Sequence, residues 1–183
     1  MNWCYSTGIH SWPGELYAAS VPLTSTVIVP PPVEPLTLAE VKLFRRIDHN
    51  LEDAMLAALI QAAREYCEGY AGQSLVTQTR EVSVAVYTEG MRLPFGPVQS
   101  VTAPPETSAP YTVQYVAGYP PVEGSDPVDY VGNIPASYKT AMQLLVGDWY
   151  ENRENTVVGT TTGPLQIAVH QLLSWYRERR GCA

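Results

Sequence analysis

Residues 134–159, IPASYKTAMQLLVGDWYENRENTVVG, predict the helix around which the rest of the chain packs. Pro135 stands where a helix begins, because the N–H that proline lacks would have no partner in the first turn. Apolar side chains then recur every three or four residues, which places them on one face of a helix. Charges of both signs follow at 151–154. The apolar face comprises Tyr138, Ala141, Met142, Leu145 and Trp149.

A short helix is predicted well before this one. Residues 37–40 (TLAE) fit a capping box, in which the threonine hydroxyl and the glutamate carboxylate each satisfy a backbone N–H. The helix should run to about Arg46, with Leu38, Val41 and Phe44 facing inward.

A second, longer helix should begin at Asp48 or Asn50 and end near Gly69 and Gly72, since glycine favours helix ends. Its apolar stripe is predicted to comprise Met55, Leu56, Leu59, Ile60, Ala63, Cys67 and Tyr70.

From Thr77 the apolar period changes to two, which indicates strands. Val82, Val84 and Val86 share one face of the first strand. Further strands are expected at 91–93, 98–102 and 111–116, and 27–29 fits a short one. Residues 117–133 are predicted to be loop. A last helix should open at Pro164, with an apolar face of Leu165, Val169, Leu172, Leu173 and Tyr176.

These elements predict an α+β fold that is mainly helical, with about four helices packed on a small antiparallel strand unit. Residues 1–36 form an extended, aromatic and proline-rich N-terminal arm, 37–158 the core, and 159–183 a C-terminal helix with a basic tail. The arm is either a loose extension or a segment that docks on a neighbouring chain. Its aromatic content favours docking, because disordered tails are poor in aromatic residues.

The composition argues against several classes of function. A net charge of −7 argues against a nucleic-acid grip that works by phosphate neutralisation. The three cysteines are widely spaced, and with the three histidines they complete no zinc pattern. The sequence contains no apolar run long enough to cross a membrane and no signal-peptide pattern, so synthesis in the cytoplasm is expected.

Catalytic motifs are largely missing from the sequence. His49 lies among Asp48, Glu52 and Asp53, which could suggest a metal or acid–base cluster. The positive end of a helix dipole explains these acids equally well. Asp148, Glu151, Arg153 and Glu154 favour an ion-pair network at an interface, and His170 a packing or interface role. We expect no enzyme, cofactor or metal.

The ordered segments resemble phage head–tail connector (adaptor) proteins of the helical-bundle type. The resemblance lies in PLTLAEVKLFRRID (35–48), LEDAMLAALIQAAREYCEGYAGQSLVTQT (51–79), LPFGPVQSV (93–101), YTVQYVAGY (111–119) and IPASYKTAMQLLVGDWYENRE (134–154). LQIAVHQLLSWYRE (165–178) is similar to the closing segment of the family.

The resemblance implies a structural virion protein in the phage neck. It would form a ring, expected to have twelve copies, under the portal protein, and would join the head to a stopper or tail component. DNA would pass through its lumen without specific binding, and neither membrane nor cofactor would be involved. The family's C-terminal segment implies portal contact by Leu172, Leu173, Trp175, Tyr176, Arg177, Arg179 and Arg180.

Contacts between subunits are expected at Trp3, Trp12, Tyr17, Arg153 and Glu154, since aromatic residues and arginine carry much interface energy. For Leu172, Leu173 and Tyr176, packing inside their own subunit is an equal alternative. Two other functions stay open: a stopper or tail terminator, and a small metal-dependent hydrolase that uses Asp48, His49 and Glu52.

Overall fold

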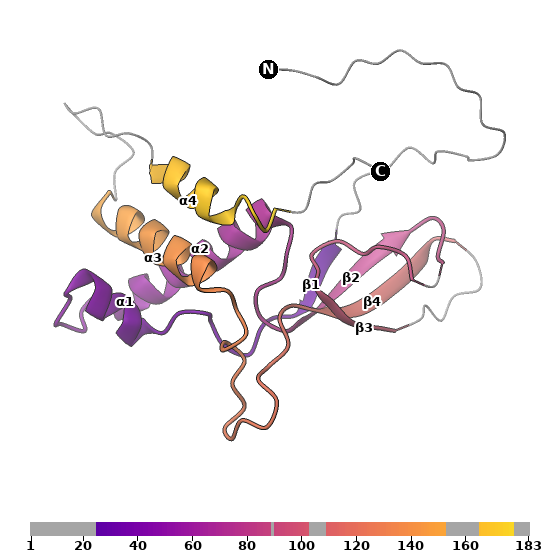
Figure 1. Cartoon of the computed structure of the whole chain (residues 1–183), viewed down its shortest axis with the longest axis horizontal. Coiled ribbons are helices and arrows are strands. Elements are labelled where there is room, and N and C mark those ends of the chain that lie inside the picture. The colour runs from indigo at the N-terminus through magenta and orange to yellow at the C-terminus, as the bar shows by residue number, and fades with distance from the viewer. Residues whose placement is uncertain (1–24, 89, 103–108, 153–164, 178–183) are drawn as a thin grey trace, which may run out of the picture.

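Four helices gather on one side of the molecule and a four-stranded sheet on the other (Figure 1). The structure is a computed structural model, and it describes residues 25–88, 90–102, 109–152 and 165–177. The observed mixture of helices and a small antiparallel sheet confirms the predicted α+β class.

Helix α1 (Leu38–Arg45) begins with the predicted capping box. The Thr37 Oγ1 accepts the Glu40 N–H at 3.2 Å, and the Glu40 carboxylate accepts the Thr37 N–H at 2.7 Å. Val41 is buried, but Phe44 is 45% exposed, so its predicted inward position is wrong. The helix is only eight residues long and the chain turns away at Arg46, whose φ is +57°, so the last turn of α1 is left partly uncovered.

Helix α2 (Asp53–Ala71) starts later than either predicted residue. The segment before it forms a turn, which the Lys42 ammonium holds by contacting Asn50 Oδ1 at 2.6 Å and Asp53 Oδ1 at 2.5 Å. The helix ends before Gly72, which adopts the left-handed conformation that glycine tolerates best. Most of the predicted stripe faces the core, with Leu56, Ile60, Ala63 and Cys67 fully buried.

Helix α3 (Ala136–Glu151) crosses α2 and carries the predicted apolar face. Tyr138, Ala141, Met142 and Leu145 are buried, and Trp149 packs at the margin of the same core. Helix α4 (Leu165–Leu173) lies against α3 (Figure 1). The core thus joins all four helices, although α4 is distant in sequence from α1 and α2.

The sheet has the order β1-β2-β4-β3, and every neighbouring pair is antiparallel. Its strands are β1 (Ser25–Val29), β2 (Gln78–Val84), β3 (Val98–Thr102) and β4 (Tyr111–Ala117). One face is apolar, because Val82 lies opposite Val113 and both are buried with Leu93. The opposite face carries mainly hydroxyl, amide and carboxylate side chains, such as Gln114 bonded to Glu81.

Two strand predictions are wrong. Val86 lies beyond the end of β2 and is exposed, because the chain leaves the sheet after Val84. Residues 91–93 form no strand among the described residues. Instead, this segment packs Leu93 against the apolar face of the sheet. It covers that face but adds no strand to the sheet.

The described end of the segment expected to be an arm packs on the core. Strand β1 pairs with β2, Leu36 is buried among the helices, and Glu34 forms an ion pair with Arg64 of α2. Residues 25–36 therefore connect the sheet to the helices.

Candidate functional site

The outward side of α4 forms an exposed surface, here called the α4 surface, that is partly apolar. Trp175 is 90% exposed and Ile167 is 54% exposed. Next to Trp175 the surface is hollowed, with a volume of about 480 Å³. An indole that stays in water in the free subunit is available to fill a pocket on a partner. The lining residues of the hollow are Ser137, Ala168, Gln171, Leu172 and Trp175.

The inward side of α4 holds this surface in place. Val169 and Leu173 are fully buried in the helical core. The His170 ring stacks on Tyr70 with centroids 4.4 Å apart, and its Nε2 lies 3.0 Å from the Tyr66 hydroxyl. The Tyr176 ring lies 4.9 Å from that of Tyr138, centroid to centroid. The orientation of α4 is therefore fixed by α2 and α3.

The residues expected to contact a portal lie in different environments. Trp175 is exposed, and Leu172 and Tyr176 are half-buried. Leu173 is inside the core, so the structure favours the alternative in which it packs within its own subunit. The guanidinium of Arg177 lies 5.3 Å from the centre of the Tyr70 ring, as in a cation–π contact. Arg179 and Arg180 lie outside the described residues.

The residues expected at a subunit interface are not described. They are Trp3, Trp12, Tyr17, Arg153 and Glu154. Their neighbour Glu151 forms an ion pair with Arg45 of α1. The Arg45 side chain reaches Glu151 by packing against Gly147 of α3, where an added Cβ would stand 3.1 Å from the Arg45 Nη1. At least one member of the predicted charged cluster thus acts within the subunit.

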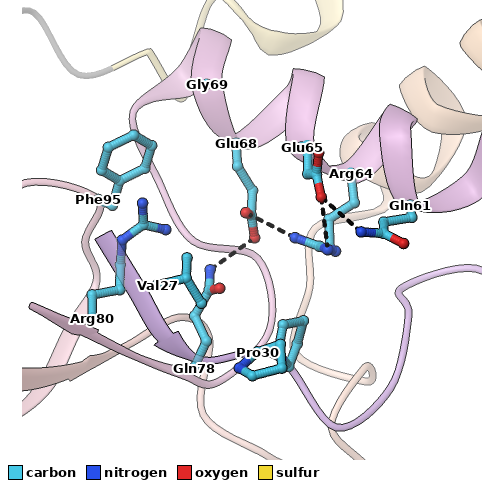
Figure 2. Close-up of a pocket in the computed structure, with 11 residues that line it drawn as sticks. Val27, Pro30, Gln61, Arg64, Glu65, Glu68, Gly69, Gln78, Arg80 and Phe95 are labelled. Carbon is cyan, nitrogen blue, oxygen red and sulfur yellow. Dashed lines mark hydrogen bonds and ion pairs between the residues drawn. The ribbon is translucent and has the colours of Figure 1, made fainter. Parts of the chain in front are cut away.

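A polar junction, defined as Glu34, Arg64, Glu68, Gln78 and Arg80, links the helices to the sheet; Figure 2 shows its four buried members, and Glu34 is partly buried. The Glu68 carboxylate lies at its centre. Its Oε1 accepts the Leu75 N–H at 2.8 Å and the Gln78 amide at 3.1 Å, and its Oε2 accepts Arg64 Nη1 at 3.1 Å. Arg64 Nε donates to Glu34 at 2.8 Å.

Burial sets the electrostatics of the polar junction. It raises the pKa of Glu68, although the Leu75 N–H and the charge of Arg64 favour the carboxylate. Burial also lowers the pKa of Arg80, whose guanidinium carbon lies 3.9 Å from the centre of the Phe95 ring. A hollow of about 410 Å³ adjoins these groups. Ion pairs join Arg64 to Glu34 and Glu68, and Arg80 donates to the Ser25 and Ser74 hydroxyls, so the junction couples the helices to the sheet.

Two of the three acidic residues near His49 are engaged in structural contacts. The Glu52 carboxylate accepts the Tyr150 hydroxyl at 2.5 Å, and Asp53 pairs with Lys42. Over the described residues, no three His, Cys, Asp or Glu side chains come together as metal ligands would. The same residues include no helix that is both long and apolar enough to cross a bilayer.

Sequence reasoning missed one exposed apolar surface, at the corner between α1 and α2. Leu51, in the connection, is 91% exposed, and Leu43 and Phe44, in the last turn of α1, are 82% and 45% exposed. We call these three residues the helical corner. Leu51 is a lone leucine between polar residues, so it has no periodic pattern that would indicate its environment.

Comparison with known proteins agrees with this architecture. Residues 35–103 match the family of phage gp6-like head-tail connector proteins. No curated protein sequence matches the chain. The matched region covers α1, α2, β2 and β3, which together carry the polar junction except for Glu34.

Three solved structures share the fold. A chain in the virion of the native gene transfer agent (GTA) particle has 18% identity and a TM-score of 0.62, over 86% of this chain and 97% of its own. A chain of the neck of the empty GTA particle, computed with C6 symmetry, has 18% identity and a TM-score of 0.65, over 87% of this chain and 97% of its own. A chain of the neck of the native particle, computed with C12 symmetry, has 20% identity and a TM-score of 0.58, over 87% of this chain and 97% of its own. The chain thus carries, over residues 35–103, a segment similar to the phage gp6-like head-tail connector proteins, and it shares its fold with chains of the GTA virion and neck.

Proposed function

We propose that this protein is a structural head–tail connector of a virion neck. It forms a ring, expected to have twelve copies, below the portal protein, extends the DNA channel and joins the head to a stopper or tail component. The observation that carries the proposal is the family match over residues 35–103, on a fold that spans 97% of the similar neck chains. Its role in this reading is mechanical rather than catalytic.

The α4 surface is the proposed portal contact. Val169 and Leu173 fix α4 because they are buried in the helical core. Trp175 and Ile167 are therefore already exposed in position for a partner. Preorganised aromatic side chains lose little conformational freedom on binding, which is why tryptophan is frequent among residues that dominate interface energies. Arg177, already beside Tyr70, adds a charge at the same end of α4 that can pair with portal acids.

The charge of the chain suits a channel that DNA must leave freely. Each subunit carries a formal charge of −7, and a ring multiplies that value. Phosphate groups are held by clustered lysine and arginine, so a negatively charged lumen would let DNA pass without a specific grip.

Portal binding by surface variants tests the proposal. Deleting α4 would also remove Val169 and Leu173 from the core, so a substitution on the exposed side is the sharper experiment. Trp175→Ala should weaken binding to the cognate portal about tenfold or more, as expected for the loss of a dominant interface residue. Leu43→Ala on the helical corner is the matched control, because Leu43 is also exposed but belongs to α1, which makes no contact with α4.

The assay is co-sedimentation with purified portal rings, and circular dichroism should show that both variants are folded. Equal portal affinity of Trp175→Ala and the unmodified protein would contradict the assignment of the α4 surface. An unmodified protein that does not bind its portal would contradict the proposed function itself.

A further inference from the structure

We propose that neighbouring subunits join through the two edges of the sheet, with β1 of one copy pairing with β3 of the next. The inference rests on the proposed ring. In the described part of the chain, β1 pairs only with β2 and β3 only with β4, so each outer strand has one side without a strand partner. The two edges lie at opposite sides of the same sheet (Figure 1).

The directions of the strands suit this contact. Because all three strand pairs are antiparallel and the sheet has four strands, β1 and β3 run in opposite directions. A second copy displaced sideways along the sheet keeps its orientation, so its β3 meets β1 as an antiparallel partner. The enlarged sheet would be antiparallel throughout.

A ring also requires two different surfaces on each subunit, because identical surfaces that meet across a two-fold axis close after two copies. The β1 and β3 edges are two such surfaces. Pairing of β1 with β1 could form a dimer, but it would leave β3 unused and could not extend around a ring.

The residue composition of β1 and β3 favours pairing with a further strand. Both are five residues long, STVIV and VQSVT, and neither contains a charged residue or a proline. Lysine and proline are common means by which proteins protect sheet edges from pairing. The valine and isoleucine side chains on these edges are between 39% and 53% exposed. A second copy would cover them.

Each edge strand also contains an irregularity in its pairing, between Val27 and Val29 in β1 and between Val98 and Ser100 in β3. Such bulges twist a strand and limit the length over which another strand can pair. They favour one short, defined contact over open-ended aggregation, as a closed ring of fixed size requires.

Cysteine cross-linking on the assembled portal complex tests the pairing. The background carries Cys4→Ser and Cys182→Ser, while Cys67 is kept, because burial raises the pKa of its thiol to about 12 and leaves it unreactive. Ile28→Cys is combined in turn with Gln99→Cys, Ser100→Cys or Val101→Cys, since a disulfide forms only where the Cβ atoms come within about 4.5 Å.

After mild oxidation, at least one double variant should give a ladder of covalent multimers, because each subunit can link to both neighbours. Each single-cysteine variant should stay monomeric. If electron microscopy shows a ring on the portal but none of the three double variants forms a ladder, the inference is overturned while the proposed function stands. Dimers formed by Ile28→Cys alone would also overturn it, since they would show β1 pairing with β1. Absence of any ring overturns the proposed function.

Lysine substitutions provide a second, independent measurement. Ile28→Lys and Ser100→Lys place a charge on the two edges and should leave a folded subunit that forms no ring on the portal. Ser83→Lys is the matched control, because Ser83 is exposed on the central strand β2, away from both edges. Rings formed as efficiently by the edge variants as by Ser83→Lys would contradict the inference.

Discussion

The imidazole ring of His170 lies parallel to the phenol ring of Tyr70, with the ring planes inclined by only 7°. The same imidazole contacts the Tyr66 hydroxyl through Nε2. These two contacts fasten α4 to α2 across a long separation in sequence, and they lie directly behind the α4 surface. The position of Trp175 therefore depends on His170, whose side chain points toward α2 and away from the α4 surface.

His170→Ala should lower the free energy of unfolding by about 1–2 kcal/mol, because it removes one aromatic stack and one hydrogen bond. Hydrogen exchange in α4 should accelerate, and portal affinity should fall with it. His49→Ala is the matched control, since His49 is exposed. An α4 whose exchange is unchanged in His170→Ala would show that the stack does not hold the helix.

The polar junction predicts a large difference between two neighbouring glutamates on α2. Glu68→Ala leaves Arg64, the Leu75 N–H and the Gln78 amide without their shared acceptor, and breaking such a buried pair costs about 3–5 kcal/mol. Glu65→Ala removes an exposed carboxylate that accepts from the Gln61 amide at 2.9 Å and lies 3.7 Å from Arg64, and it should cost less than about 1 kcal/mol. Urea denaturation measures both values, and similar losses for the two variants would be inconsistent with the junction.

Two leucines that bracket the start of α2 provide a similar comparison for the core. Leu56 is fully buried, and Leu56→Ala should cost about 2–5 kcal/mol through lost burial and an unfilled cavity. Leu51 belongs to the exposed helical corner, so Leu51→Ala should change stability by no more than about 0.5 kcal/mol. Thermal unfolding of both variants checks the assignment of these residues, and the reverse order would refute it.

The capping box of α1 predicts a specific dependence on pH. The hydrogen bond from the Thr37 N–H lowers the pKa of Glu40 below its usual 4.5, so the folded state favours the carboxylate. The stabilisation is therefore present above about pH 4.5 and is lost as the pH falls through the lowered pKa of the folded state. Glu40→Gln keeps the shape of the box but removes the charge.

The unmodified protein should exceed Glu40→Gln in unfolding free energy by about 0.5 kcal/mol at pH 7, the size typical of an exposed carboxylate at a helix start. The difference should shrink toward pH 3. Chemical denaturation at both values measures it, and a difference independent of pH would mean that the carboxylate is not charged in the folded box.

Local patterns predicted much of the fold. The capping box located α1, and the apolar period of 3.6 located the buried faces of α2 and α3, because both signals depend on residues close in sequence. The strand prediction at 98–102 was confirmed for the same reason. Phe44 was misplaced because periodicity does not indicate whether another element covers the last turn of a short helix.

The polar junction and the divided role of α4 could not be predicted in this way. Arg64 and Glu68 appear as ordinary charges four residues apart, and only the tertiary fold brings Glu34 and Gln78 to them. Leu172 and Leu173 are adjacent and equally apolar, yet only Leu173 is fully buried. The sheet order, on which the two free edges depend, likewise follows from contacts between distant segments.

The most direct test of the central claim is electron microscopy of the purified protein mixed with its cognate portal. We predict a ring stacked on one end of the portal, with the α4 surface against the portal and a continuous channel through both. A protein that stays separate from the portal, while remaining folded by circular dichroism, would contradict the assignment of this chain as a head–tail connector.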